Sequence, residues 1–598
     1  MKKANWILKN DEIFSLDFDD FYYNIKEPLK ERNGIYIDNA FSNAFNKLTI
    51  LELGFGLGLN FFLSAKRAID LGIKLHYVAI ENYYQSIDDI RYFCNKFGIE
   101  LNNNFINDYP PCKDGIYRIE FDGVVLDLVF QDVNIALKDL DFLADVVYAD
   151  GFSPNKNKEM FSKETLKYVK KLLKLTGKLV SYSSNSDFKK SLIELGFEIH
   201  DINLGIKRES TLAILKHKDL QDDIEGYFHK NYLEVNNIAI IGGGIAGATI
   251  AYELSKLGKT ISVFEQSHTL ANEGSGNKIG LLTALIQNPS SLLGEFSQFS
   301  FWHSSKFYKK LGYSLEGILE HAYTDELRER FKLQKDNPLI KLHFDFAYLK
   351  DGGTLEPCKL VPKIFAKSNT RIFLNYKLNS FREFYDRVEL DFDNKIMIFD
   401  AVIFASGAYS KEIFSNLPLS VVRGQATWLK NKIKYKHPIS SKAYITGAKD
   451  GIILLGATYD RNLIAEASRE YDDININNFK EIFKADFSDL VIGNRVGYRS
   501  YSSDRFPIVG AYFNEEKYKN LYKSLQFDKH KPQVNSPRSR IFINTAHGSR
   551  GLSSAITSAR LIASYFNNTP SGMFKRYEHA LHPARFLIRD LKKGLVKD

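Results

Sequence analysis

The chain has 598 residues, of which 44% are hydrophobic, so it can bury more than one core, and we expect at least two folded domains. A formal charge of +9 is compatible with a polyanionic partner, but the lysine excess is equally typical of an AT-rich genome. No stretch of about 18 uncharged apolar residues occurs, which argues against a membrane span or a signal peptide and predicts a soluble, cytoplasmic protein. Three scattered cysteines without a CxxC pair indicate neither a disulfide framework nor a zinc site, so we expect no metal.

Strand-like runs alternate with amphipathic, helix-length segments in the N-terminal third of the chain. This alternation predicts an α/β domain, with a mostly parallel sheet covered by helices on both faces. A charged stretch without a strand pattern then precedes a second βαβ pattern. We therefore expect a first domain over 1–220, a linker over 221–236 and a second domain over 237–598. The strand candidates of the first domain are 48–53, 75–81, 144–150, 177–184 and 211–216.

The first glycine loop lies in "ELGFGLGLN", which starts at Glu52. A predicted strand runs directly into Gly54, Gly56 and Gly58 and then into a helix. Glycines let the backbone turn sharply and approach a ligand, and the free N–H groups of the helix N-terminus point towards it. A lone glycine triplet also fits a simple tight turn. The next strand ends at Glu81, whose carboxylate is placed to accept hydrogen bonds from a ribose diol, and this favours a nucleotide cradle that includes Glu52.

Two aspartates follow later strands of the same predicted sheet. Asp132 in "VFQDVN" falls where an adenine edge would lie, although a solvated loop aspartate fits equally well. Asp150 ends the strand "ADVVYAD", at the sheet edge where ligands bind in open α/β folds. There it can accept hydrogen bonds from, or deprotonate, an amine that is about to be alkylated. The alternative role for Asp150 is the N-cap of a following helix.

The second glycine loop is "IIGGGIAGATIAYEL", with Gly242, Gly244 and Gly247 between a predicted strand and a predicted helix. The following strand ends at Glu265, about 23 positions after the first glycine. This is the complete dinucleotide-binding fingerprint in its proper context. We expect the helix N-terminus to face a pyrophosphate and Glu265 to bind the adenosine ribose.

NAD and FAD both use such a loop, and three later segments favour FAD. "NEGSGNKIG" is small, polar and glycine-rich, so it can lie along the phosphates or the flavin ring. "AVIFASGAYS" resumes the nucleotide domain late in the chain, and "INTAHGSRGLSSA" reads as a strand, a glycine turn and a helix start near the flavin pyrimidine. The candidate flavin contacts in these segments are Ser275, Gly276, Asn277, Gly407, Gly548, Ser549 and Gly551.

Arg499 and Arg550 lie in the later motifs "GYRSYSSDRFPIVG" and "HGSRGLSSA". A guanidinium group offers a planar, bidentate fit to a carboxylate, so two arginines at a flavin site would suit an amino-acid-like substrate. The alternative is that both are ordinary surface arginines.

In their order along the chain these motifs, together with "DGFSPNKNKEMF", "VRGQ" and "GATYD", resemble the MnmC family of bifunctional tRNA-modifying enzymes. The resemblance covers essentially the whole chain. There are departures: Lys158 stands where the family usually has proline, and the flavin segment from Gly274 to Gly280 differs in detail from the common family run. These exchanges affect details of substrate contact more than the class of activity.

The resemblance implies a Rossmann-like class I methyltransferase sheet followed by an FAD-binding domain with an α+β substrate subdomain, as in D-amino-acid and glycine oxidases. It implies FAD, S-adenosyl-L-methionine and tRNA as ligands, and a monomer. The oxidase would convert 5-carboxymethylaminomethyl-(2-thio)uridine at the wobble position to the 5-aminomethyl nucleoside, and the methyltransferase would then form 5-methylaminomethyl-(2-thio)uridine. In these reactions Arg499 and Arg550 would clamp the substrate carboxylate, and Asp150 would serve the amine.

Two other functions share these motifs. A fused small-molecule amine or amino-acid oxidase and N-methyltransferase would turn over free glycine or sarcosine. An RNA-binding scaffold that has lost catalysis would retain tRNA without reducing a flavin. The intact glycines together with Glu81, Asp150 and Glu265 argue against the scaffold.

Overall fold

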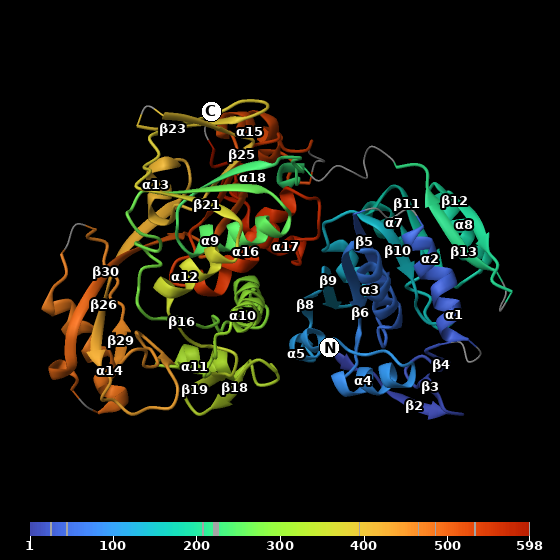
Figure 1. The fold of residues 1–598 in the computed structure, drawn as a ribbon, viewed down its shortest axis with the longest axis horizontal. Helices are drawn as coiled ribbons and strands as arrows, with labels where there is room; N and C mark the ends of the chain where they lie inside the picture. The colour runs from blue at the N-terminus through green and yellow to red at the C-terminus, as the bar shows by residue number, and fades with distance from the viewer. Residues whose placement is uncertain are drawn as a thin grey trace. The chain divides into compact units, whose positions relative to one another are not determined.

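The computed structural model describes residues 1–23, 27–42, 46–205, 209–218, 226–393, 395–463, 466–484, 486–530 and 534–596. The chain divides into two compact units (Figure 1). Unit 1 comprises Met1–Ile224 and Asn568–Arg576, and unit 2 comprises Glu225–Asn567 and Tyr577–Asp598. Each unit is described separately below.

Unit 1 is built on one mixed sheet whose centre is parallel. Strands β11, β10, β5, β6 and β9 are parallel neighbours, and antiparallel strands extend both edges. The expected strands of the first domain are all present, so the predicted α/β class is confirmed. In sheet order the strands are β12 (Phe197–Ile202), β13 (Ser210–Leu215), β11 (Leu173–Ser181), β10 (Ala144–Ala149), β5 (Lys47–Leu53), β6 (Lys74–Glu81), β9 (Val124–Phe130) and β8 (Gly115–Phe121).

The remaining elements of unit 1 flank this sheet (Figure 1). Short N-terminal strands form a small antiparallel sheet, β2 (Trp6–Lys9), β3 (Glu12–Ser15) and β4 (Asp20–Phe21), and β1 (Lys2–Lys3) pairs with β7 (Tyr83–Tyr84). The helices are α1 (Pro28–Arg32), which a π-helical turn continues over Asn33–Ile37, α2 (Asp38–Phe41), α3 (Leu59–Leu71), α4 (Ile87–Lys96), α5 (Asn103–Asp108), α6 (Val133–Lys138), α7 (Lys163–Leu172) and α8 (Ser186–Glu194).

A segment from the far end of the sequence, 568–576, completes unit 1. It meets a buried charge cluster in which Arg118 donates from Nε and Nη2 to the two carboxylate oxygens of Asp127, at 2.7 and 2.6 Å. The His76 ring lies 2.7 Å from the same carboxylate, and Arg118 also donates to the carbonyl oxygen of Pro570 at 2.9 Å. Although burial opposes ionisation, Arg118 holds the pKa of Asp127 well below its usual range. The cluster therefore fixes a guanidinium group against which 568–576 docks.

Unit 2 contains a second, mostly parallel sheet, in which β31 alone is antiparallel to its neighbour. Side chains along its strands alternate between the two faces. Ile240 in β14 faces α9, whereas Ala239 and Ile241 join an apolar core on the opposite face with the small sheet of β22 (Ser380–Glu383), β23 (Val388–Phe392) and β24 (Lys395–Phe399). Helices α9 (Ile245–Lys256) and α16 (Gly551–Tyr565) pack side by side, flanked by α12 (Pro357–Ala366) and α10 (Leu292–Lys310). In sheet order the strands are β21 (Thr370–Leu374), β15 (Thr260–Glu265), β14 (Asn237–Ile241), β25 (Ala401–Phe404), β32 (Ile541–Thr545) and β31 (Ile508–Ala511).

A separate, largely antiparallel sheet forms the α+β part of unit 2, as the resemblance implies. Its longest strand pairing is that of β26 with β30, in which Arg499 lies opposite Val422. In sheet order the strands are β18 (Lys341–His343), β19 (Phe346–Leu349), β17 (Ile318–His321), β27 (Ile439–Ser440), β28 (Tyr444–Ile445), β29 (Ile452–Gly456), β26 (Leu419–Lys430) and β30 (Val491–Ser502). The other elements that begin after residue 225 are β16 (Gly280–Leu282), β20 (Gly353–Leu355), β22 (Ser380–Glu383), β23 (Val388–Phe392), β24 (Lys395–Phe399), α11 (Asp325–Lys332), α13 (Ser410–Ile413), α14 (Arg469–Phe483), α15 (Glu515–Tyr522), α17 (Lys575–Leu581) and α18 (Arg585–Lys592).

The docking of 568–576 predicts a stability effect at Gly572. This glycine has a φ of +74°, and a Cβ atom there would lie 2.6 Å from the Arg118 guanidinium group. Gly594 has a similar φ of +65° with open space around it, so Gly594→Ala measures the cost of the left-handed backbone alone, roughly 1–2 kcal/mol. We expect Gly572→Ala to lower the melting temperature of unit 1 clearly more than Gly594→Ala lowers that of unit 2.

Thermal unfolding measures this, with the unit 1 transition identified by its rise when S-adenosyl-L-methionine is added. Equal small shifts for the two variants would contradict the docked position of 568–576.

Candidate functional site

The first glycine loop turns sharply at the carboxyl edge of the unit 1 sheet and passes close to the end of the neighbouring strand. Gly54, Gly56 and Gly58 all have positive φ, at 91°, 54° and 84°. A Cβ atom on Gly54 would lie 2.8 Å from the carbonyl oxygen of Asp150, so the ends of β5 and β10 approach this closely only because a glycine stands there. Gly58 then begins α3 as its N-cap.

Glu81 braces this loop from the neighbouring strand. Its Oε2 atom accepts a hydrogen bond from the Gly56 amide at 2.8 Å, and its Oε1 atom accepts one from the Tyr83 amide at 2.8 Å. Burial raises the pKa of the Glu81 carboxyl. Asp132 caps α6, where its Oδ1 atom accepts from the Asn134 and Ile135 amides at 3.0 and 3.3 Å. Both side chains line the same cavity.

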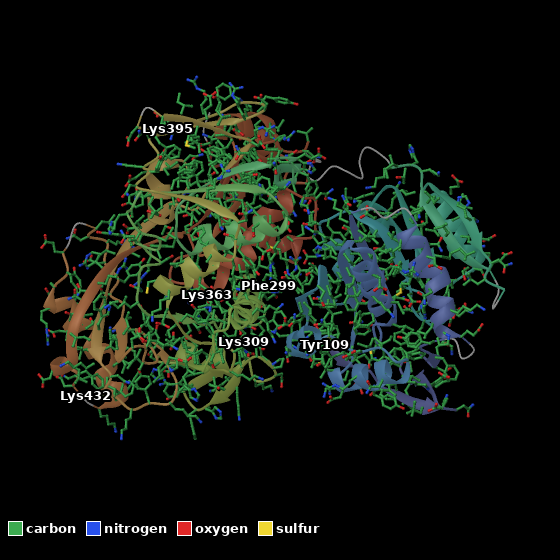
Figure 2. The ribbon with its side chains drawn as sticks, in the orientation of Figure 1. Tyr109, Phe299, Lys309, Lys363, Lys395 and Lys432 are labelled. Atoms are coloured by element: carbon green, nitrogen blue, oxygen red, sulfur yellow. The ribbon has the colours of Figure 1, made fainter. Side chains whose placement is uncertain are left out.

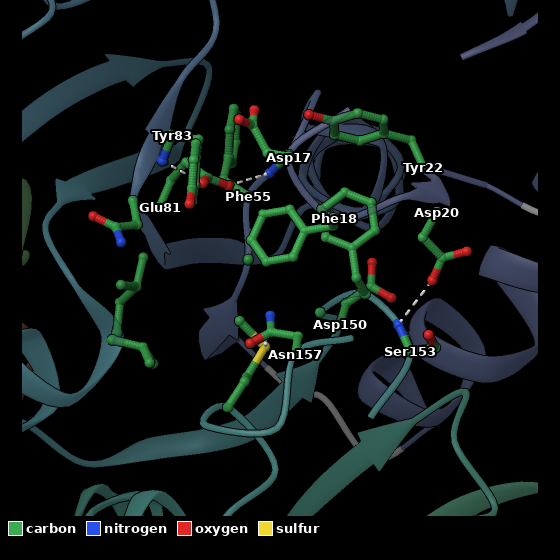
Figure 3. Close-up of a pocket in the computed structure, with 18 of the residues that line it drawn as sticks. Asp17, Phe18, Asp20, Tyr22, Phe55, Glu81, Tyr83, Asp150, Ser153 and Asn157 are labelled. Carbon is green, nitrogen blue, oxygen red and sulfur yellow. Dashed lines mark hydrogen bonds between the residues drawn. The ribbon is translucent and has the colours of Figure 1, made fainter. Parts of the chain in front are cut away.

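This cavity of unit 1 has a volume of about 670 Å³ (Figure 3). Among the predicted residues Gly54, Gly56, Glu81, Asp132 and Asp150 line it, whereas Glu52 and Gly58 are buried next to it. The N-terminal segment supplies much of the remaining wall, which no local spacing in the sequence indicated. The wall residues from this segment are Asp17, Phe18, Asp20, Phe21, Tyr22, Tyr23, Glu31 and Arg32.

The N-terminal segment is attached to the loop that follows Asp150. Phe18 stacks on Phe152 with ring centroids 4.4 Å apart, and the Ser153 amide donates to Asp20 Oδ2 at 3.1 Å (Figure 3). No helix begins directly after Asp150, because α7 starts only at Lys163 with Ser162 as its cap. Asp150 is thus not a helix N-cap and its carboxylate is turned to other partners.

Asp150 lies in a dense polar cluster. Its Oδ1 atom accepts from the Tyr36 hydroxyl at 2.7 Å and forms an ion pair with Arg32, and its Oδ2 atom accepts from Asn60 Nδ2 at 2.9 Å. Asn60 also donates to Glu52 Oε1 at 2.9 Å. Burial raises the pKa of Glu52 well above its usual range, and the nearby Asp150 charge adds to this shift. Glu52 is therefore a buried member of the cluster that holds Asn60, and Asp150 is the carboxylate that lines the cavity.

The second glycine loop repeats this arrangement in unit 2. Gly242 has a φ of +118°, Gly244 is the N-cap of α9, and a Cβ atom on Gly247 would overlap the carbonyl oxygen of Gly242. Glu265 at the end of β15 accepts from the Gly243 amide at 2.8 Å through Oε2. All four residues of the predicted fingerprint thus meet at the start of α9.

The segment around Ser275 lies against the same helix start. Ser275 Oγ accepts from the Ile245 amide at 3.0 Å, in the first turn of α9. Arg495 ties the segment down by donating to the carbonyl oxygens of Asn272 and Glu273 and, at 3.3 Å, to Asn277 Oδ1. A Cβ atom on Gly276 would overlap the Arg495 guanidinium group, which accounts for the glycine.

The other predicted flavin segments converge on this place. Gly407 follows β25, and its carbonyl oxygen accepts from the Thr545 hydroxyl at 2.9 Å. Gly548 has a φ of +58° and begins the turn that leads through Ser549 into α16. A Cβ atom on Gly551 would lie 3.3 Å from the Ile245 side chain, so the first turns of α16 and α9 are adjacent.

A cavity of about 270 Å³ opens beside the start of α16 and brings the two predicted arginines together. Arg499 reaches it from β30 and Arg550 from the N-cap of α16. Arg550 Nε is buried and has no hydrogen-bond partner within the described part of the chain. The other polar side chains of the wall were not predicted individually, although they lie in the quoted motifs. They include Tyr459, Tyr501, Arg505 and His547.

The electrostatics of this cavity favour an anionic ligand. Burial lowers the pKa of His547 to about 4, and its ring lies 2.8 Å from Ser554 Oγ and 2.9 Å from Asn544 Oδ1, so it is neutral and fixed at neutral pH. The Tyr459 hydroxyl donates to the Tyr501 hydroxyl at 2.5 Å. Glu320, which accepts from Thr283, faces Arg550, and burial raises the pKa of Glu320 to about 7. Glu320 therefore offsets the positive charge of Arg550 only in part, and this charge lies at the cavity.

Two family profiles match the chain, one for each unit. A family described as FAD dependent oxidoreductase matches residues 237–565, and one described as S-adenosyl-L-methionine-dependent methyltransferase matches residues 98–216. The tRNA 5-methylaminomethyl-2-thiouridine biosynthesis bifunctional protein MnmC of Campylobacter jejuni subsp. jejuni serotype O:6 (strain 81116 / NCTC 11828) is 41% identical over 614 residues, covering 100% of both chains. This chain belongs to the MnmC family.

A second MnmC protein, from Campylobacter concisus (strain 13826), is 34% identical over 629 residues, again covering 100% of both chains. Among solved structures, glycine oxidase from Geobacillus kaustophilus is similar over 56% of this chain and 95% of its own, with 18% identity and a TM-score of 0.45. The chain therefore joins an S-adenosyl-L-methionine-dependent methyltransferase domain to an FAD-dependent oxidoreductase domain, as the motifs predicted.

The residues of this MnmC-family chain fit both groups. At Gly54, Gly242 and Gly247 a Cβ atom would overlap a neighbouring backbone oxygen, so only glycine fits these turns. The amides at the starts of α3 and α9 are placed to receive a carboxylate or a pyrophosphate. Within the described ranges, no group of three or more His, Cys, Asp or Glu residues is arranged to hold a metal ion. None of the helices described above is long and apolar enough to cross a membrane.

Glu320 predicts a pH dependence of stability. Its folded-state pKa of about 7 lies above the ordinary value of 4.5, so the folded state binds more protons than the unfolded state between these two values. Folding stability therefore falls as the pH rises through this window. Glu320→Gln removes this titration. We therefore expect the melting temperature of Glu320→Gln to rise relative to that of the wild type between about pH 5 and about pH 8.

Differential scanning fluorimetry across this range measures the effect, with Glu329→Gln as a control, since Glu329 is exposed on α11. A constant difference between Glu320→Gln and wild type at every pH would show that Glu320 does not titrate in this way.

Proposed function

We propose that this chain makes 5-methylaminomethyl-(2-thio)uridine at the wobble position of tRNA through two consecutive reactions. Unit 2 removes the carboxymethyl group from 5-carboxymethylaminomethyl-(2-thio)uridine, and unit 1 methylates the amine that remains. The observation that carries the proposal is the presence of two different cavities in one MnmC-family chain, one with paired arginines and one with a buried carboxylate. We place this work in the cytoplasm, where tRNA is found.

In unit 2 the substrate resembles glycine, because a secondary amine carries a –CH2–COO⁻ group. Arg499 and Arg550 would bind the carboxylate and hold the adjacent carbon and nitrogen in a fixed position. The α9 loop and the Ser275 segment would hold FAD, which would supply the two-electron oxidation by accepting a hydride from the carbon, while the N–H proton would leave to solvent. Water adds to the resulting imine, and the C–N bond breaks to give glyoxylate and the aminomethyl nucleoside. The neutral His547 adds no positive charge to that of the arginines in the cavity wall.

In unit 1 the aminomethyl nitrogen attacks the methyl carbon of S-adenosyl-L-methionine. A new C–N bond forms, the C–S bond breaks with its electron pair going to sulfur, and the nitrogen finally releases a proton. The nitrogen must be unprotonated to attack, so its orientation and its proton both matter. Asp150 is the carboxylate at the cavity wall that can contact this amine.

The large substrate agrees with the charge of the protein, which has 81 Lys and Arg against 72 Asp and Glu. Lysines project from many elements of unit 2 rather than from a single helix; Figure 2 labels Lys309 in α10, Lys363 in α12, Lys395 in β24 and Lys432 after β26. Phosphate contacts of this kind would position the RNA without reading its sequence. Recognition of the modified base would then lie with the two cavities.

The purified protein tests the proposal with tRNA from cells that lack this gene. Nucleosides are analysed by mass spectrometry after incubation with and without S-adenosyl-L-methionine. We expect loss of the carboxymethyl group in both samples and the methylated nucleoside only with the methyl donor. Turnover of free glycine or sarcosine with unchanged tRNA would support a small-molecule enzyme instead, and tRNA binding without either reaction would support a scaffold.

Asp150→Ala should separate the two reactions. Because unit 2 is untouched, the variant should still remove the carboxymethyl group, and the aminomethyl nucleoside should accumulate even with the methyl donor present. The same mass spectra provide the control, since loss of the carboxymethyl group reports an intact unit 2. Complete methylation by this variant would remove Asp150 from the proposed site.

Arg550→Met should impair only the oxidation. Leaving the substrate carboxylate without its partner should lower kcat/KM for flavin reduction by tRNA at least about 30-fold. The variant should keep its bound flavin, because the Arg550 side chain is directed at the cavity and not at the α9 loop. Arg328→Met, at an exposed ion pair on α11, is the matched control. Wild-type rates of flavin reduction in Arg550→Met would exclude the carboxylate clamp.

A further inference from the structure

The N-terminal segment contributes two side chains whose position the sequence motifs did not predict. Arg32 ends α1 and Tyr36 lies in the π-helical turn that follows. Both are buried, with Tyr36 fully inaccessible and Arg32 7% exposed. Both meet the same carboxylate oxygen, Asp150 Oδ1, more than a hundred residues further along the chain. Burying an arginine is costly unless it is paired, so its presence at this cavity wall requires an explanation beyond packing.

The hydrogen-bond direction at Tyr36 is fixed by its surroundings. The Tyr182 amide donates to the Tyr36 hydroxyl oxygen at 3.2 Å, so the hydroxyl hydrogen is free for Asp150 Oδ1 at 2.7 Å. The Arg32 guanidinium group lies 5.2 Å from the Tyr23 ring centroid and 5.3 Å from that of Tyr36, which limits its movement. Tyr36 is thus held by a contact besides Asp150, and two aromatic rings lie beside the Arg32 guanidinium group.

The other carboxylate oxygen is also engaged. Asn60 Nδ2 donates to Asp150 Oδ2 at 2.9 Å and is itself held by Glu52 Oε1. The two carboxylate oxygens of Asp150 thus interact with one cation and two neutral donors, which leaves an acceptor position on Oδ2. Asp150 also lines the cavity, where the amine must approach. Such a carboxylate is suited to accept a hydrogen bond from the amine and so to direct the nitrogen lone pair.

We propose that Arg32 and Tyr36 are positioning residues of the methyl transfer, which hold Asp150 as a fixed hydrogen-bond acceptor for the substrate amine rather than as the base that takes its proton. This inference rests on the function proposed above. The amine then loses its first proton to solvent before it binds in reactive form. After the C–N bond forms and the C–S bond breaks, the second proton also leaves to solvent, and Asp150 acts only as a hydrogen-bond acceptor.

The ionisable groups around Asp150 come from several elements. They are Arg32 and Tyr36 from the α1 region, Tyr23 before it, Glu52 from β5 and Tyr182 after β11. Burial raises the pKa of each of the three tyrosines, so they are neutral, and Glu52 is the one nearby group of this set that would add negative charge. Arg32 is therefore the one cation of this set, and Arg32→Met removes the charge that pairs with Asp150.

The experiment follows single-turnover methylation of tRNA that carries the aminomethyl nucleoside, as a function of pH. In the wild type the rate should rise with pH along the titration of the substrate amine alone. In Arg32→Met the rate should fall about 100-fold at every pH, because the acceptor is misplaced. Arg32→Lys keeps the charge and should restore a large part of the rate.

Tyr36→Phe is the milder companion variant, since it removes one hydrogen bond and keeps the ring. We expect a loss of about 10-fold in kcat with S-adenosyl-L-methionine affinity within about threefold of wild type. Arg67→Met serves as the matched control, because Arg67 forms an exposed ion pair on α3 of the same unit. Loss of the carboxymethyl group by unit 2 and the melting temperature report whether each variant is folded.

Several results would overturn the inference. One is that Arg32→Met and Tyr36→Phe both match wild type. Another is that both lose activity only through weaker methyl-donor binding, with Arg32→Lys no better than Arg32→Met. A wild-type pH profile that contains the ionisation of an enzyme carboxyl would restore Asp150 as the base. Failure of the wild type itself to methylate this tRNA would contradict the proposed function and the inference with it.

Discussion

A carboxylate at the end of one parallel strand braces the glycine loop at the end of the neighbouring strand, and this interaction occurs once in each unit. Glu81 accepts from the Gly56 amide at 2.8 Å, and Glu265 accepts from the Gly243 amide at the same distance. Each contact holds a sharp turn open at the start of a helix, where free amides can receive an anionic group. In unit 1 the braced loop and Glu81 form part of the cavity wall. In unit 2 the cavity opens at the start of α16, whose first turn is adjacent to that of α9.

The two cavities differ in the charge of their side chains, as two consecutive reactions on one substrate require. The cavity of unit 2 carries Arg499, Arg550 and a neutral His547, which suits a substrate with a carboxylate. The cavity of unit 1 carries Asp150, which suits an amine without one. In the proposed function, the first reaction removes the carboxylate that the Asp150 side would repel. The charges at the two walls favour this order of the reactions.

Much of the fold and of the two candidate sites could be predicted from local sequence. The strands of unit 1 followed from their apolar runs, and the glycine loops from spacings that only a strand, a turn and a helix satisfy. Arg499 and Arg550 came from motifs far apart in the sequence, yet they reach one cavity. These features share a cause, because each depends on residues a few positions apart or on the common carboxyl edge of a parallel sheet.

The parts that escaped prediction depend on contacts between distant segments. Tyr36 and Asp150 are separated by 114 residues, and no spacing indicates that they share a hydrogen bond. Pro570 meets Arg118 across 452 residues, so 568–576 was assigned to the second domain on its position in the sequence alone. Glu320 lies in no recognisable motif, and burial raises its pKa although the Arg550 charge opposes this shift. Long-range packing, not local pattern, decides these positions.

The origin of the final methyl group tests the central claim most directly. The wild-type protein is incubated with tRNA bearing the carboxymethylaminomethyl nucleoside and with S-adenosyl-L-methionine whose methyl group is isotopically labelled. Two consecutive reactions require that the methylaminomethyl product carries the full label and that glyoxylate is released in equal amount. An unlabelled methyl group, as direct decarboxylation of the carboxymethyl group would produce, would contradict the account.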